Sequence, residues 1–172
     1  MKINIPLHRF GAKPEKWPFF YGWFVLFAGA VGMLVSLPGQ TIGMSVFIDP
    51  LMTALGAGRS RVSFAFMIGT LGAALVLPAM GRLYDRRGAP FMAVLSGAAV
   101  GLVLLYMAGI DIFARFAAGI PFISRHNLDS LIVLSFGFLF LQLWGQGVLT
   151  MVSRTMVMKW FDRRRGFANG IF

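Results

Sequence analysis

Four runs of this chain carry no charged residue and are long enough to cross a lipid bilayer. About 30 Å of hydrocarbon requires about 20 apolar residues at 1.5 Å each. The uncharged runs are Phe19–Ile48, Val62–Gly81, Pro90–Ile110 and Ser130–Ser153. The sequence therefore predicts an all-α, polytopic membrane helix bundle. The helices are expected at about 19–48, 62–81, 90–110 and 130–158, with the start of a fifth at 166–172.

The composition agrees with a lipid environment. Only 13% of the residues are charged and 58% are hydrophobic, whereas about a quarter of a soluble domain is charged. The net charge of +10 could indicate nucleic-acid binding. The basic residues stand in short clusters between the uncharged runs, however, as positively charged cytoplasmic ends do. We therefore expect no nucleic acid and a lipid bilayer as the surroundings.

The basic clusters also predict the orientation. Residues 1–18 form a basic segment that we place in the cytoplasm, with the protein in a bacterial inner membrane. The inner ends then hold most of the basic residues: Lys2, Arg9, Lys13, Lys16, Arg82, Arg86, Arg87, Arg154, Lys159, Arg163, Arg164 and Arg165. The outer ends hold only Arg59, Arg61, Arg115 and Arg125. At the first outer connection, Asp49-Pro50 is typical of the start of a short helix.

The sequence contains no set of residues that is typical of an enzyme active site. There is no cysteine, and the two histidines, His8 and His126, stand outside the runs and far apart. No acid pair, metal-ligand set, nucleophile with a base, or phosphate-binding glycine loop is present. We therefore expect no enzyme activity, no metal and no cofactor.

The first run is interrupted by Pro38-Gly39, followed by Gln40 and Thr41. A proline inside a helix removes one backbone hydrogen bond and bends the helix. In transporters such breaks are tolerated where the backbone lines a cavity. Gln40 and Thr41 are therefore candidate substrate contacts. The alternative is that Gln40 only bonds carbonyls freed by the kink.

Polar residues also recur in the fourth run. Gln142, Gln146, Thr150 and Ser153 follow one another at steps of four, four and three, which places them on one face of a regular α-helix. We expect Gln142 and Gln146 to face a substrate cavity, with hydrogen bonding between helices as the alternative. The four runs contain no titratable group, so a proton relay would need residues outside them.

The segment from Gly81 to Pro90 resembles a signature loop of the major facilitator superfamily. The matching residues are Gly81, Asp85, Arg86 and Gly88, whereas Pro90 replaces the final basic residue of the pattern. The resemblance implies a cytoplasmic loop that acts as a conformational latch between two halves of a transporter. An ordinary positively charged turn is the alternative interpretation.

Two further segments, Tyr21–Leu26 and Lys159–Gly170, are similar to the branch that contains monocarboxylate transporters and oxalate/formate antiporters. The second segment belongs to the cytoplasmic loop before the fifth helix, whose basic residues are Arg154, Arg163, Arg164 and Arg165. A lysine that the animal carriers have in the first helix is absent near Gln40, and an antiporter arginine is replaced by Leu139.

The resemblance implies a secondary active transporter that works by alternating access on a small solute, an organic anion such as a monocarboxylate. The family fold has two six-helix halves. We therefore expect residues 19–172 to form an incomplete N-terminal half, whose partner is the missing C-terminal half. The alternatives are a small four-helix membrane scaffold and an inactive truncated product.

Overall fold

The computed structural model describes residues 21–113 and 129–160, together with the single residues Gly166 and Gly170. Every regular element in these ranges is helical, and four helices are long and apolar enough to cross a membrane. This confirms the all-α prediction. The predicted segment 1–18 and most of the predicted fifth helix lie outside the described residues.

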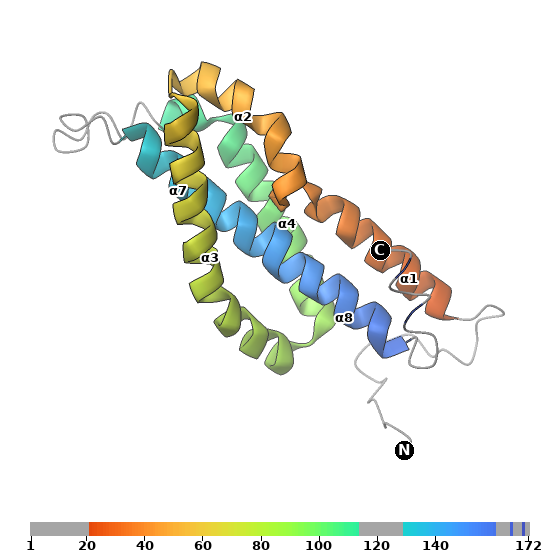
Figure 1. The fold of residues 1–172 in the computed structure, drawn as a ribbon. Coiled ribbons are helices and arrows are strands. Elements are labelled where there is room, and N and C mark those ends of the chain that lie inside the picture. Colours follow the sequence, from red (N-terminus) through yellow and green to blue (C-terminus); the bar gives the residue numbers. More distant parts are fainter. Residues whose placement is uncertain (1–20, 114–128, 161–165, 167–169, 171–172) are drawn as a thin grey trace.

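Each span consists of one or more helical elements. They are α1 (Tyr21–Ser36), η3 (Leu37–Gly39) and α2 (Thr41–Leu55) in the first span, α3 (Arg59–Arg87) in the second, α4 (Ala89–Ala108) in the third, and α7 (Asp129–Leu141), η4 (Gln142–Leu149) and α8 (Thr150–Trp160) in the fourth. The spans alternate in direction. The turn between α3 and α4 lies at the same end of the bundle as the start of α1 and the end of α8 (Figure 1).

The first span is longer than predicted at its C-terminal end, which is called its outer end in line with the expected orientation. The helix α2 continues through Asp49 and Pro50 to Leu55, so the expected start of a separate short helix at Asp49 is wrong. Pro50 costs one backbone hydrogen bond inside α2, and the surrounding apolar residues continue the helix. The helix ends at Gly56, which takes up a left-handed conformation with φ of 57°.

The second span is also longer than predicted. Its helix α3 reaches Arg87, and Gly88 alone separates it from α4. The expected loop over residues 82–89 is therefore mostly helical. Charged residues mark where the hydrocarbon ends, but arginine and leucine are good helix formers. The helix stops only where Gly88 adopts φ of 83°.

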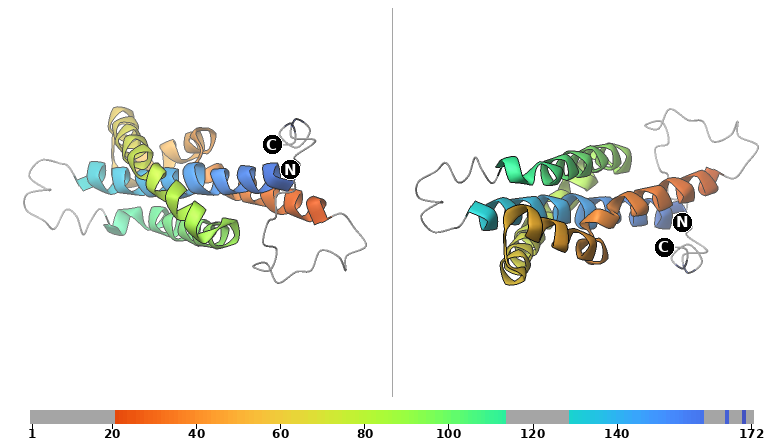
Figure 2. Two further views of the ribbon diagram at one scale, coloured as in Figure 1. Left: turned by 90° about the horizontal axis from the view of Figure 1, so that it is seen from below. Right: turned by 90° about the horizontal axis from the view of Figure 1, so that it is seen from above.

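The fourth span is the centre of the bundle. Half of its most apolar stretch is buried inside the bundle, against 22% for each of the other three spans. Figure 2 shows α4 on one side of it, with α2 and the outer part of α3 on the other. Leu134 and Phe138 of α7 are fully buried in the outer cluster of apolar side chains. A second cluster, around Met92 and Val152, lies nearer the inner end.

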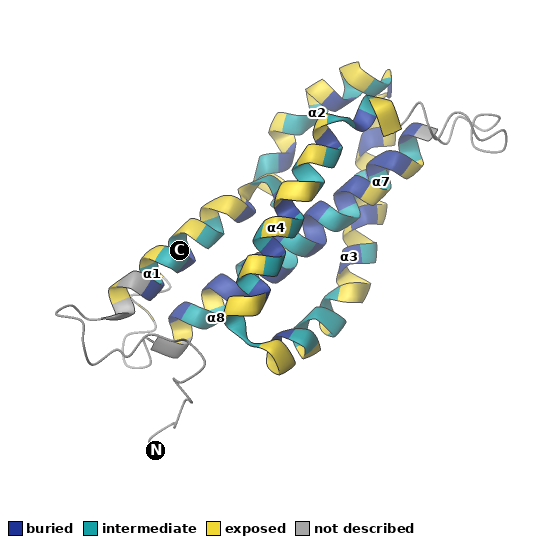
Figure 3. Cartoon of the chain, turned by 180° about the vertical axis from the view of Figure 1, so that it is seen from behind, coloured by how far each residue is buried: buried dark blue, intermediate teal, exposed yellow. Residues whose placement is uncertain are grey.

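Many large apolar side chains are exposed on the outside of the bundle, and Figure 3 shows exposed residues along the helices. Leu75 of α3 is 83% exposed, and Val94 and Leu105 of α4 are exposed by 75% and 72%. Water would penalise this arrangement, but hydrocarbon does not. Together with the helix lengths, it describes a multi-pass membrane protein.

Candidate functional site

Two segments that depart from the α-helix lie against each other within the bundle. One is the 3₁₀ turn η3 of the first span, and the other is η4 of the fourth span, which is a π-helix over eight residues. Their backbones meet at Gly39 and Gly145. A Cβ on Gly39 would lie 2.9 Å from the Cα of Gly145, and one on Gly145 would lie 3.0 Å from the Cα of Gly39. Only glycine fits at either position without displacing the other helix.

The break in the first span follows from Pro38 and Gln40. Proline has no N–H to continue the helical ladder, and Gln40 has an extended backbone with ψ of 154°. The Gln40 N–H donates to the Leu37 carbonyl at 3.0 Å, and its carbonyl accepts from the Met44 N–H at 3.2 Å. Gln40 therefore ends one helix and begins the next.

The side chain of Gln40 bonds a hydroxyl and not a carbonyl freed by the kink. Its Nε2 donates to Ser36 Oγ at 2.8 Å. Ser36 has no exposed surface and donates in turn to the Met33 carbonyl at 2.7 Å. The hydroxyl of Thr150 on α8 lies 3.4 Å from Ser36 Oγ, within reach as a second donor. Ser36 thus connects the broken first span to the fourth.

Gln142 lies at the beginning of the π-helix and is buried. Its Nε2 donates to Thr70 Oγ1 of α3 at 3.1 Å, and Thr70 donates to the Phe66 carbonyl at 2.8 Å. This is the hydrogen bond between helices that the sequence left open as the alternative to a cavity contact. Gln142 therefore connects the fourth span to the second.

The π-helix divides the polar face predicted for the fourth span. Gln142 contacts α3, Gln146 is exposed, and Thr150 contacts α1. Ser153 is buried against Gly32, where a Cβ on the glycine would overlap its Oγ. The expectation that these residues share one face is wrong for this conformation. Each residue of a π-helix turns the chain by a smaller angle than a residue of an α-helix, so the residues after η4 point in a different direction from the one that α-helical spacing predicts.

The candidate residues near the break therefore differ in their surroundings. Gln40 is half-buried, Thr41 and Gln146 are exposed, and Gln142 is buried. Gln146 lies close to the first span, since a Cβ on Gly39 would be 3.0 Å from its backbone nitrogen. All these groups are uncharged, so the site offers amide and hydroxyl hydrogen bonds to a ligand. Among the described residues, no group of three or more metal-ligating side chains occurs.

Two hollows in the described part of the chain lie away from the break. One is an apolar groove of about 230 Å³ between α4 and α7, and the other is an open hollow of about 530 Å³ beside the turn from α2 to α3. Neither includes a side chain of the candidate cavity. At the paired breaks themselves, the backbones of the first and fourth spans are in close contact at Gly39 and Gly145.

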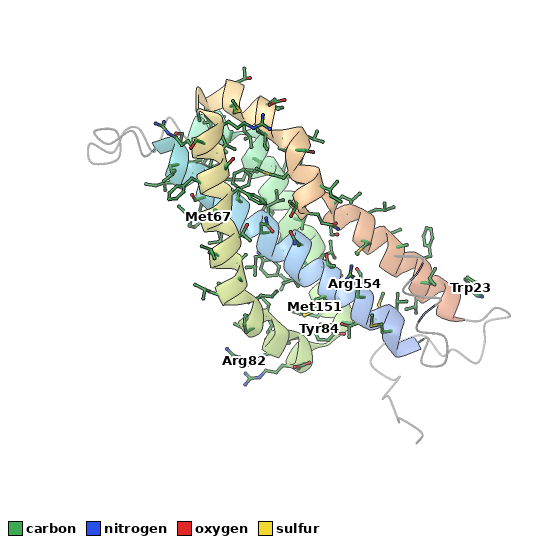
Figure 4. All side chains as sticks on the ribbon, viewed as in Figure 1. Trp23, Met67, Arg82, Tyr84, Met151 and Arg154 are labelled. Atoms are coloured by element: carbon green, nitrogen blue, oxygen red, sulfur yellow. The ribbon has the colours of Figure 1, made fainter. Side chains whose placement is uncertain are left out.

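The segment that resembles a latch occupies the inner end of α3 and the turn into α4. Asp85 and Arg86 are both exposed, and no ion pair joins Asp85 to another residue that the structure describes. A Cβ on Gly81 would meet nothing within 4 Å among the described residues, so no neighbouring helix approaches closely there. Figure 4 shows Arg82 at this end of α3, beside Tyr84, which packs among buried apolar residues.

The structure describes only some of the other basic residues at the end of the bundle where α3 meets α4. Arg154 lies on α8 with an exposed side chain. Arg87 is exposed, and its guanidinium lies 5.1 Å from the centre of the Phe91 ring, a cation–π arrangement. Arg163, Arg164 and Arg165 lie outside the described residues.

The sequence did not single out three residues that build this site. Ser36 is a small residue among the glycines of the first span, and Thr70 stands alone among apolar and small residues in the second. Gly145 and Gly147 flank Gln146, and this Gly-Gln-Gly sequence within a span was the available signal for an irregular backbone. No family model, curated protein or solved structure matches this chain.

Proposed function

We propose that this chain forms the first helices of a secondary active transporter of the major facilitator type. Its substrate is a small organic anion such as a monocarboxylate, and it works by alternating access. The protein lies in a bacterial inner membrane with its N-terminus in the cytoplasm. A second half of the transporter is the partner that completes the substrate cavity.

The observation that carries this proposal is the contact between two interrupted spans, at Gly39 and Gly145, inside a membrane bundle. A lipid environment penalises irregular backbone unless protein or water surrounds it. Interrupted helices near the middle of the bilayer are where secondary transporters bind their substrates. Gln40 and Gln146, next to this contact, have amide groups that can donate to a carboxylate.

The latch interpretation is supported by the ends of α3 and α4. Asp85 is an acidic residue among Arg82, Arg86 and Arg87, and it is exposed at the end where cytoplasmic contacts are expected. An exposed acid there can pair with a second half of a transporter in one conformation and separate from it in the other. Such a contact shifts a two-state equilibrium without touching the substrate.

Uptake of labelled anions tests the proposed function. Cells that express the protein from its own gene are compared with cells in which that gene is disrupted, using labelled formate, lactate and oxalate, with a neutral sugar as the control solute. We expect faster uptake or exchange of at least one anion, and no difference for the sugar. Equal rates for every anion, with the protein present in the membrane, would contradict the proposal.

A further inference from the structure

The π-helix η4 stands between two regular α-helical segments. The flanking residues Leu141 and Thr150 have φ and ψ of −63° and −43°, and −63° and −44°, which are ordinary α-helical values. In a π-helix each N–H bonds the carbonyl five residues earlier, whereas in an α-helix it bonds the fourth. The fourth span therefore accommodates extra backbone in η4 relative to a continuous α-helix.

A continuous α-helix would bring the divided polar residues together. At about 100° per residue, Gln142, Gln146, Thr150 and Ser153 would lie within roughly 80° of one another. In the observed conformation, Gln142 contacts α3 while Thr150 and Ser153 contact α1. The sequence spacing thus matches an α register that differs from the observed one.

Two hydrogen bonds, one at each end of η4, fit only the observed register. At the first residue of the segment, Gln142 bonds Thr70 of α3 at 3.1 Å, and directly after the segment Thr150 lies 3.4 Å from Ser36 of α1. Converting the segment to an α-helix would turn α8 relative to α7 by about 100°, the rotation of one residue. With α1 and α3 in place, the two bonds cannot both survive that rotation.

The residues of η4 are suited to a change of register. Gly145 and Gly147 have no side chains to repack, and the facing Gly39 is also a glycine. The Thr150 hydroxyl also lies 3.2 Å from the Gly145 carbonyl, five residues earlier, so its single proton is shared between this carbonyl and Ser36 Oγ in the observed register. None of the residues of η4 itself is charged, so the change of register within this segment brings no ion into hydrocarbon.

We infer that the fourth span has two registers, the observed π register and an α register in which α8 is rotated and the four polar residues form one face. The claim that this switch acts as the gate of a transporter rests on the function proposed above. The claim that the helix changes register rests on the geometry of η4 and on the hydrogen bonds of Gln142 and Thr150.

Distances between spin labels can detect the two registers, because the chain contains no cysteine that would compete for labelling. The reporting pair is Leu105→Cys with Met158→Cys, two exposed positions on opposite sides of η4 along the bundle. The reference pair is Leu105→Cys with Leu75→Cys, which does not involve the fourth span. In lipid nanodiscs, we expect two distances for the reporting pair and one for the reference pair.

Three variants assign the distances. Deleting Gly147 lets an ordinary α-helix join α7 to α8 close to their observed orientation, so the reporting pair should keep only the distance of the observed structure. Gly147→Ala retains the length and should retain both distances. Thr150→Val removes the bond to Ser36 and should increase the share of the second distance at least twofold.

A single distance in the unmodified chain that neither Thr150→Val nor the deletion alters would overturn the switch. If the deletion changes the reference distance, the variant is misfolded, and the unmodified chain with Thr150→Val decides alone. Two distances in a protein that transports no anion would support the switch and contradict the proposed function, so the two failures are distinguishable.

Discussion

Gly39 and Gly145 bring the backbones of the first and fourth spans into direct contact at the place where both depart from the α-helix. The atoms next to each glycine are backbone atoms of the other span, including the Leu141 carbonyl oxygen, 2.5 Å from a Cβ on Gly39. Backbone cannot move aside as a flexible side chain can. The contact therefore tolerates no added methyl group on either residue.

Gly145→Ala should lower the free energy of unfolding by about 1–3 kcal/mol, the usual cost of overpacking a filled site. The added Cβ would lie 3.0 Å from the Gly39 Cα and 3.4 Å from the Ser36 carbonyl oxygen. Unfolding by SDS in mixed micelles measures the change. The matched control is Gly97→Ala in α4, where a Cβ meets nothing within 4 Å and stability should be unchanged or slightly higher. Equal stability of the two variants would mean that the spans are not in contact here.

A double-mutant cycle of Gln142→Leu and Thr70→Val measures how far their effects on the free energy of unfolding depend on each other. We expect a coupling energy of about 0.6 kcal/mol, with about 1.7 kcal/mol as the upper bound. Each variant removes one partner of the 3.1 Å hydrogen bond between the fourth and second spans. The same SDS titration provides the four free energies. Thr70→Ser keeps a hydroxyl that can accept from Gln142 and should retain most of the coupling. Strictly additive effects would show that the bond does not form in the membrane.

Gly88→Ala should destabilise the turn between α3 and α4 by about 1–3 kcal/mol, because φ of 83° with ψ of 169° is accessible almost only to glycine. Thermal unfolding in detergent, followed by circular dichroism, measures the loss. Gly81→Ala is the control seven residues earlier, since a Cβ there has open space among the described residues. A loss of similar size in both variants would locate the effect in the helix and not in the turn.

Asp85→Asn should reduce anion uptake while leaving the amount of protein in the membrane unchanged. The change removes the one acidic charge from the exposed inner end of α3 without altering its shape. Asp49→Asn, an exposed position at the outer end of α2, serves as the control and should transport normally. Normal uptake by both variants would remove the latch role from Asp85.

Gln40→Ala and Gln146→Ala should each raise the apparent KM for the transported anion several-fold, because each removes an amide donor beside the paired breaks. Thr53→Ala is the control. Its hydroxyl bonds the Asp49 carbonyl of its own helix at 3.0 Å, at the outer end of α2. If KM and the maximal rate are both unaffected at the two glutamines, neither residue contacts the substrate.

The number and type of the long helices could be predicted from the sequence, because the absence of charge over about 20 residues leaves a chain few alternatives to crossing a bilayer. The residues at which these helices end could not be predicted from the sequence. Arg82, Arg86 and Arg87 follow the apolar stretch and still continue α3, and Pro50 does not interrupt α2. Hydropathy reports the thickness of the membrane, whereas backbone hydrogen bonds determine where a helix stops.

The break at Pro38 was visible in the sequence because proline acts on its own backbone. For the π-helix the sequence offered only the glycines Gly145 and Gly147, because the partners of Gln142 and Thr150 lie on α3 and α1, far away in the chain. The prediction that Gln142 lines a cavity and the prediction that four polar residues share a face both assumed a uniform helix. Local spacing could not reveal a register determined by tertiary contacts.

The central position of the fourth span also has a consequence for biosynthesis. Helices enter the membrane in the order in which they are translated and associate afterwards. The span that is half-buried is the last of the four to be made, and the three before it each have about a fifth of their apolar stretch buried. A nascent chain stopped before residue 129 would therefore contain three inserted helices with little to hold them together. The emergence of residues 129–160 from the ribosome is the event that assembles the bundle.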